Sequence, residues 1–382
     1  AIFPRQGMAL VNVEPKNKVF RFLPEEIAQG SEGVREMPAL YYFFGTPREI
    51  YQAFLNFRNK EVHPVLRPKF EWFGVGWEAW GALGTNTNHI TVKENIDKYL
   101  ADGYPLRWMV VGSGFWPSKP DEYAATTSFG MWDEQNYPNP KAFIEYFHHK
   151  GLLFHIGLRI GFTPGGPFTQ EGLENGYYLK GDDGKPRLFR VGIPKLPVYV
   201  LDAHQPDAVD WYVGLCNKWL DDGVDGFKED LFKYDQSLLL RDDFVDPVNQ
   251  KLMEQGVYIM GRNAYLGSVA DIHRYNDFNF HHPQDRGPIN GLALAYSGFP
   301  NVYPDIVGGW LGNRYEEVSW RKKRTYLIRY AQYASLNPSM AFGYGPWNFD
   351  EETNALCLGA AQLQDRLLPH IYSNAMRAYH TG

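Results

Sequence analysis

The segment DAVDWYVGLCNKWLDDGVDGFKED, residues 207–230, contains the repeating unit from which the fold can be inferred. Apolar residues at helical spacing run up to Gly223, and the short apolar run after this glycine is typical of a strand. The strand ends in three consecutive charged residues, Lys228, Glu229 and Asp230. The segment therefore predicts a helix followed by a strand, with a charged cluster at the strand's carboxyl end.

The same unit recurs from Pro68 onward. Helical patterns at 138–151 and 244–256 are each followed directly by a strand pattern, at 152–160 and 257–265. Such repeats imply a parallel sheet with crossover helices. Seven or eight units suit a closed (β/α)8 TIM barrel, and an open doubly wound sheet is the alternative. No glycine-rich nucleotide motif follows a strand, so a nucleotide cofactor has no support.

Two segments interrupt this pattern. Residues 1–62 contain short strand patterns and the helical stretch PREIYQAFLNFRNK, and predict a β-rich segment ahead of a barrel over 63–382. The stretch GYYLKGDDGKPRLFRV predicts a β-hairpin that turns at Asp183-Gly184, inserted near 163–197. Loops that follow the strands of such barrels carry the active site.

The composition limits the classes of partner. The 382 residues include 38 basic and 44 acidic side chains without a basic run, so nucleic acid is not expected as a partner. Aromatic residues make up 16% of the chain, which suits sugar binding, although core packing explains most of them. No apolar run reaches about 18 residues, so no membrane span is predicted. The chain opens on AIFPRQGM, without a signal-like segment, and leaves the compartment open, with periplasm and exterior as candidates.

Metal and cofactor sites are not expected. The two cysteines, Cys216 and Cys357, make no disulfide framework. The pair His281-His282 has no clustered partner and is interpreted as loop structure. Nothing in the sequence predicts the oligomeric state.

The charged strand end suggests a chemistry. Side chains alternate along a strand, so Lys228 and Asp230 share one face while Glu229 lies on the other. Asp230 is at the carboxyl end, where a barrel presents catalytic groups, and Lys228 favours its ionised form. A covalent glycosidase nucleophile requires such a carboxylate. A salt-bridged strand end is the structural alternative.

The segment GVDGFKED resembles the nucleophile motif of glycoside hydrolase family 31, the α-glucosidase-like retaining enzymes. Four further segments are similar to family segments in the family's order: YVLDAHQPDAVDWYV, YIMGRNAYLGSVADIHRYND, SGFPNVYPDIVGG and RLLPHIYSNAMRAY. The early stretch PALYYFFGTPREIYQAF resembles the end of the family's N-terminal β-sandwich. The resemblance implies a TIM barrel with a short sandwich remnant, acting on a glycoside or oligosaccharide.

The resemblance also implies catalytic roles. Asp230 would be the nucleophile, and Asp277 the general acid that later serves as base. The pKa of Asp277 would be raised by burial and nearby negative charge. Asp271 and Asp285 are the alternatives for the acid.

Six side chains are candidates for substrate binding. Arg262 would bind sugar hydroxyls near the nucleophile, Asp305 would accept hydrogen bonds from the same sugar, and Lys228 matches a lysine of some family members. Three tryptophans would be sugar platforms, with a core role as the alternative for each: Trp77, Trp116 and Trp310.

Three positions depart from the pattern of the family's α-glucosidases. Gly112 stands where an aspartate is usual, Arg190 where a tryptophan is usual, and Gly343 where a histidine is usual. We therefore predict a retaining exo-α-glycosidase whose preferred sugar is not plain glucose. An α-galactoside and a modified sugar are the options, and Arg190 with Arg274 would suit an anionic group. A transglycosidase and a non-catalytic sugar-binding barrel are the other interpretations.

Overall fold

The computed structural model describes most of the barrel region and parts of the N-terminal segment. The described residues are 2–3, 9–14, 19–24, 39–40, 42–61, 64–112, 115, 129–181, 183–191, 196–230, 245–262, 269–275, 286–309, 311 and 316–381.

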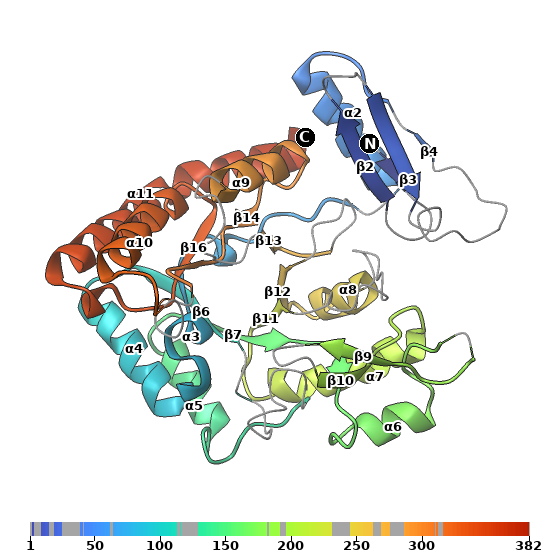
Figure 1. Cartoon of the computed structure of the whole chain (residues 1–382), viewed down its shortest axis with the longest axis horizontal. Helices are drawn as coiled ribbons and strands as arrows, with labels where there is room; N and C mark the ends of the chain where they lie inside the picture. The colour runs from blue at the N-terminus through green and yellow to red at the C-terminus, as the bar shows by residue number, and fades with distance from the viewer. Residues whose placement is uncertain are drawn as a thin grey trace.

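A nine-stranded parallel sheet forms the centre of the molecule (Figure 1). Its hydrogen-bonded order is β14-β13-β12-β11-β7-β6-β5-β16-β15. Its strands are β5 (Gly74–Glu78), β6 (Leu106–Val111), β7 (Leu153–Leu158), β11 (Gly226–Glu229), β12 (Tyr258–Gly261), β13 (Ile272–Arg274), β14 (Val302–Tyr303), β15 (Ile306–Val307) and β16 (Ser339–Phe342). The two end strands, β14 and β15, are separated in the chain only by Pro304 and Asp305. The sheet therefore curls round until its two ends are consecutive in the sequence.

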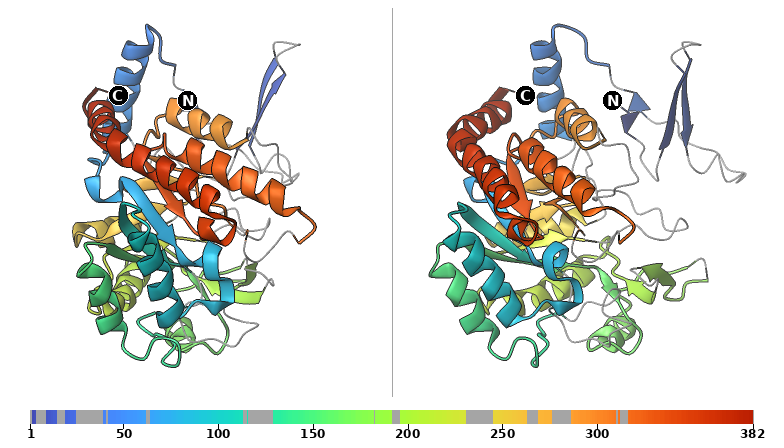
Figure 2. Two further views of the ribbon diagram at one scale, coloured as in Figure 1. Left: turned by 90° about the vertical axis from the view of Figure 1, so that its left-hand side faces the viewer. Right: turned by 60° about the vertical axis from the view of Figure 1, so that its left-hand side comes forward.

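Helices connect the strands and lie outside the curled sheet (Figure 2). The α-helices are α2 (Pro47–Glu61), α3 (Ala79–Leu83), α4 (His89–Ala101), α5 (Pro140–His148), α6 (Thr169–Glu174), α7 (Pro206–Leu220), α8 (Asp246–Glu254), α9 (Arg286–Tyr296), α10 (Trp320–Ala334) and α11 (Glu351–Thr381). Three 3₁₀ turns accompany them: η1 (Phe70–Trp72), η2 (Gly84–Asn86) and η3 (Pro346–Asn348). None of the described helices is long and apolar enough to cross a membrane.

The interior of the curled sheet is filled by side chains. Trp72, Trp108 and Tyr303 belong to one buried cluster, and the ring of His155 stacks on Trp72 with centroids 4.2 Å apart. A Cβ atom on Gly76 would lie 2.3 Å from the Trp108 indole, so only glycine fits there. The inner space is thus a packed core rather than a channel.

We expect Gly76→Ala to destabilise the fold by about 1–3 kcal/mol, because the new methyl group overpacks the indole of Trp108. Gly214→Ala is the matched control, since Gly214 is exposed inside α7 and has no atom within 4 Å of an added Cβ. Alanine there should stabilise by about 0.5–1 kcal/mol. Urea denaturation of both variants measures the two opposite signs, and equal effects would contradict this account of the barrel core.

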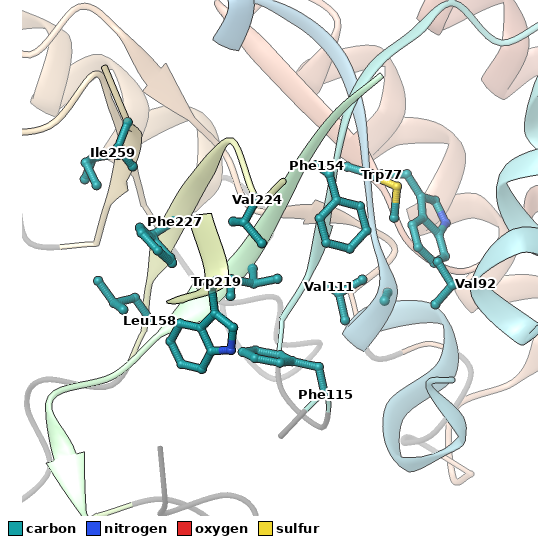
Figure 3. Close-up of a cluster of buried hydrophobic side chains, with 14 of the residues drawn as sticks. Trp77, Val92, Val111, Phe115, Phe154, Leu158, Trp219, Val224, Phe227 and Ile259 are labelled. Carbon is teal, nitrogen blue, oxygen red and sulfur yellow. The ribbon is translucent and has the colours of Figure 1, made fainter. Parts of the chain in front are cut away.

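A second apolar layer lies between the sheet and the helices. Figure 3 shows part of it, with Trp77 beside Val92 of α4, and with Phe227 and Trp219 on the β11 side. Trp77 is fully buried, and its Nε1 donates a hydrogen bond to the carbonyl of Gly343 at 3.2 Å. The sugar-platform role predicted for Trp77 is therefore corrected to a core role.

An antiparallel sheet follows β7. Its strands are β8 (Gly161–Phe162), β10 (Leu196–Val200) and β9 (Leu188–Val191), in that order. Within 176–191 the chain turns at Asp183-Gly184: Gly184 N donates to Gly181 O at 2.9 Å, and the φ of Gly184 is 74°. This sheet extends from the carboxyl end of β7, on the side where the barrel strands end.

The N-terminal segment contains two antiparallel strand pairs. They are β1 (Ile2–Phe3) with β4 (Ala39–Leu40), and β2 (Ala9–Glu14) with β3 (Val19–Pro24). Figure 1 shows β2 and β3 away from the central sheet. The sandwich remnant and the domain boundary at residue 62 stay predictions.

Candidate active site

Asp230, the residue after β11, is held between two arginines. Arg262 Nη1 donates to Asp230 Oδ1, and Arg159 Nη2 donates to Asp230 Oδ2 at 3.4 Å. Burial by itself would raise the pKa of Asp230, but the surrounding cations lower it to about 2, in the order Arg262, Arg159, Arg274 and Lys228. The carboxylate is ionised at neutral pH, and a quarter of its side-chain surface is exposed.

A charged network lies beside it, made of Glu78, Lys228, Tyr303, Asp305 and Arg274. Lys228 Nζ donates to Glu78 Oε2, and Tyr303 Oη donates to Glu78 Oε1 at 2.5 Å. Arg274 donates two hydrogen bonds to Asp305, from Nε to Oδ1 at 2.8 Å and from Nη2 to Oδ2 at 3.0 Å. Lys228 Nζ lies 3.9 Å from Asp305 Oδ1. The network thus joins groups from β5, β11 and β13 and from the break after β14.

Asp305 lies in a strained backbone conformation. Its φ is 65°, and among the described residues it is the one non-glycine residue with a positive φ. It occupies the break between β14 and β15, where Tyr330 Oη donates to the carbonyl of Pro304. Such strain persists only where surrounding contacts enforce it, and the fork of Arg274 does so here.

Lys228 and Asp230 lie on the same side of β11, as strand alternation predicts. Lys228 pairs with Glu78, however, and contributes less to the lowered pKa of Asp230 than the arginines do. Sequence reasoning missed both Glu78 and Arg159. Their signal was position alone: Glu78 is the last residue of β5, and Arg159 is the first after β7.

Glu229 lies on the opposite side of β11 and holds Arg262 in place. Its carboxylate accepts hydrogen bonds from Asn249 Nδ2 at 2.6 Å and from the backbone N of Arg262 at 3.2 Å. Burial raises the pKa of Glu229, and the two hydrogen bonds lower it. Burial is the larger effect, and the resulting pKa is about 7. Glu229 is therefore a positioning residue behind the pair of Arg262 and Asp230.

We expect Glu229 to make the stability of the fold depend on pH. Because its pKa rises from 4.5 to about 7 on folding, the folded state holds the proton of Glu229 more tightly than the unfolded state. Its contribution to the free energy of unfolding is therefore complete below pH 4.5 and is lost as the pH rises to about 7. The loss is about 3 kcal/mol at most. Urea denaturation at several pH values should give a smaller drop for Glu229→Gln than for the unaltered chain. Parallel curves would mean that Glu229 stays ionised when folded.

The remaining predicted residues have mixed outcomes. Asp271, an alternative acid, precedes β13 at the amino-terminal end of the sheet, where it accepts a bond from Ile259 N and pairs with Lys69 Nζ at 3.2 Å. It lies at the other end of the strands from Asp230, so its predicted catalytic role is corrected to a structural one. Six residues lie outside the described part, and their roles stay predictions: Asp277, Asp285, Trp116, Trp310, His281 and His282.

The three positions that depart from the glucosidase pattern are all described. Gly112 follows β6, and an added Cβ there would lie 3.7 Å from Trp80, an ordinary contact distance. Gly343 follows β16, and an added Cβ there would lie 2.6 Å from Ile306, so a side chain would require Ile306 to move. Arg190 is exposed on β9. Arg274 is bound to Asp305, which reduces its capacity to receive an anionic sugar. Among the described residues, no group of three or more His, Cys, Asp and Glu side chains could hold a metal ion.

Comparison with known proteins places this geometry among sugar-processing barrels. The family model described as the glycosyl hydrolases family 31 TIM-barrel domain matches residues 66–374, which confirms the predicted barrel. An α-xylosidase of Lactiplantibacillus pentosus is 27% identical over 280 residues, covering 65% of this chain and 35% of that protein. An α-xylosidase of Emericella nidulans is 21% identical over 272 residues, covering 66% and 34%. This chain thus spans about a third of the length of these relatives.

Solved structures share the fold at low identity. A Flavobacterium johnsoniae dextranase of the same family, complexed with glucose, has a TM-score of 0.72 at 18% identity, covering 89% of this chain and 44% of that one. A sulfoquinovosidase from E. rectale has a TM-score of 0.68 at 15% identity, covering 88% and 53%.

Proposed function

This chain belongs to glycosyl hydrolase family 31, and we propose that it is a retaining exo-acting α-glycosidase. The observation that carries the proposal is the ionised Asp230, fixed by Arg262 and Arg159 at the carboxyl end of a barrel strand. A nucleophile must be ionised and partly exposed before substrate arrives, and Asp230 meets both conditions. The substrate class is a glycoside or oligosaccharide with a terminal α-linked sugar.

The reaction proceeds in two displacements. In the first, an oxygen of Asp230 forms a bond to the anomeric carbon while the bond to the leaving oxygen breaks, and Asp277 gives that oxygen its proton. In the second, water attacks the anomeric carbon, its proton passes to Asp277, and Asp230 leaves as a carboxylate. A sugar hydroxyl in place of water would make the same chain a transglycosidase.

The charged groups around Asp230 support this sequence of events. A carboxylate with a pKa of about 2 is a weak base and therefore a good leaving group in the second displacement. Arg262 and Asp305 have the donors and acceptors to bind hydroxyls of the same sugar. Since the two relatives named above are called α-xylosidases, α-xylose is the first sugar to test.

A proton NMR time course tests the proposal with the chain and aryl α-glycosides of xylose, glucose, galactose, N-acetylgalactosamine and glucuronic acid. We expect the α-anomer of one sugar to appear first. The β-anomer appearing first would overturn the double displacement. Faster release of glucuronic acid than of its neutral counterpart would support the anionic-sugar prediction for Arg190 and Arg274. Binding of a sugar without release of any would favour a sugar-binding barrel.

A further inference from the structure

A cavity lies at the amino-terminal end of the sheet, away from Asp230. Its volume is about 360 Å³, within the range of small-molecule sites. Asp271 and Asn301, which line it, directly precede β13 and β14, whereas the candidate catalytic groups follow their strands. Residues of helices α2, α9 and α11 line it, and Tyr51 Oη of α2 donates to the carbonyl of Tyr296, another lining residue, at 2.7 Å.

The walls of this cavity are mostly apolar. They include Phe54 and Leu55 from α2, Leu292 from α9, Ala378 from α11, and Phe299. The ring of Phe299 lies 5.5 Å from the guanidinium carbon of Arg58 and 5.0 Å from the ring centre of His273. The aromatic wall thus continues directly into a polar floor.

The floor contains buried polar atoms that no neighbour satisfies. Arg58 Nε, His273 Nε2 and Asn301 Oδ1 each lack a hydrogen-bond partner among the described residues. The side chains of Arg58 and His273 are 7% and 6% exposed. Asp271 Oδ1, which belongs to another residue of the lining, is a fourth such atom. Buried polar groups are almost always paired, so four orphaned atoms around one cavity indicate a ligand that supplies missing bonds.

Charge selects the kind of ligand. Burial lowers the pKa of Arg58 to about 10, so it is cationic at neutral pH, and burial lowers the pKa of His273 to about 3, so its imidazole is neutral. The carboxylate of Asp271 forms an ion pair with Lys69. Asp246 raises the pKa of Arg58 through its charge, but it does not line the cavity. Arg58 is therefore the charge that faces the space, and a carboxylate is its natural complement.

We propose that this cavity binds a small molecule with an aromatic or aliphatic body and one carboxylate. The carboxylate pairs with Arg58, and the body packs against Phe54, Leu55 and Phe299. The site is independent of the glycosidase proposed above, because it shares no residue with the groups around Asp230.

Three probes with one apolar body test the proposal: 3-phenylpropionate, 3-phenylpropanol and 3-phenylpropylammonium. Ligand-observed NMR with the full chain measures their dissociation constants. We expect the carboxylate to bind at least about tenfold tighter than the alcohol, the factor expected of one charge-assisted bond, and the ammonium not to bind. Equal binding of carboxylate and ammonium, or no binding of any probe, would overturn it.

Variants then locate the site. Arg58→Met should lose the preference for carboxylate while still binding the alcohol, which also shows that the cavity is intact. Ala378→Phe should fill the space and exclude all probes. Arg377→Met, which removes an exposed arginine of the same helix, should change nothing. Undiminished carboxylate binding in both Arg58→Met and Ala378→Phe would place the probe elsewhere and refute the site.

Discussion

Asp230→Ala is expected to lower kcat for an aryl α-glycoside by at least about 10⁴-fold, because removing a covalent nucleophile abolishes the first displacement. KM should change far less, since Arg262 and Asp305 are kept for the sugar hydroxyls. Steady-state kinetics on the sugar identified by NMR measures both. A binding barrel would instead keep its affinity and show no turnover before or after the change.

Azide as an external nucleophile tests whether Asp230 is the group that attacks the sugar. In Asp230→Ala the vacated space lies between Arg262 and Arg159, which suits a small anion. Azide should attack the activated aryl glycoside in place of the carboxylate and yield a β-glycosyl azide, with part of the lost rate restored. Asp210→Ala, at an exposed carboxylate of α7, is the matched control and should keep full activity. An α-glycosyl azide, or full activity without azide, would assign the nucleophile to another residue.

Much of the barrel could be predicted because local signals repeat. The helix pattern that closes at Gly223 corresponds to α7 (Pro206–Leu220), and the strand after it to β11. Helix α10 was not predicted. Four consecutive cationic residues, 321–324, occupy its first turn, so the apolar pattern of the buried Leu327, Ile328 and Ala331 does not stand out in the sequence. Local patterns thus predict elements well where apolar spacing is regular, and poorly where charge dominates a helix end.

The site was predicted only in part, for a geometric reason. Every residue of β5 is buried, so apolar alternation gave no indication of which side faces the interior. Trp77 was therefore placed at the sugar, whereas it faces the helices, and Glu78, which faces the charged network, was overlooked. Glu78 and Lys228 are 150 positions apart, and only the curl of the sheet brings them together.

The burial of this pair also makes the network costly to break. Lys228 and Glu78 have 8% and 2% of their side chains exposed, so Lys228→Met would leave a buried carboxylate with Tyr303 as its neighbouring donor. We expect a loss of about 3–5 kcal/mol in unfolding free energy, measured by urea denaturation at pH 7. Lys98→Met, which breaks the more exposed pair with Asp102, should cost no more than about 0.5 kcal/mol.

The double variant Lys228→Met/Glu78→Gln separates charge from packing. If the cost of Lys228→Met comes from an unpaired buried charge, neutralising Glu78 as well should return most of the lost stability, because the amide keeps a bond to Tyr303 without a charge to desolvate. If the double variant is as unstable as Lys228→Met alone, the lysine acts by filling space between β5 and β11. A loss of under about 1 kcal/mol in the single variant would mean that water reaches Glu78 and that the network is solvated.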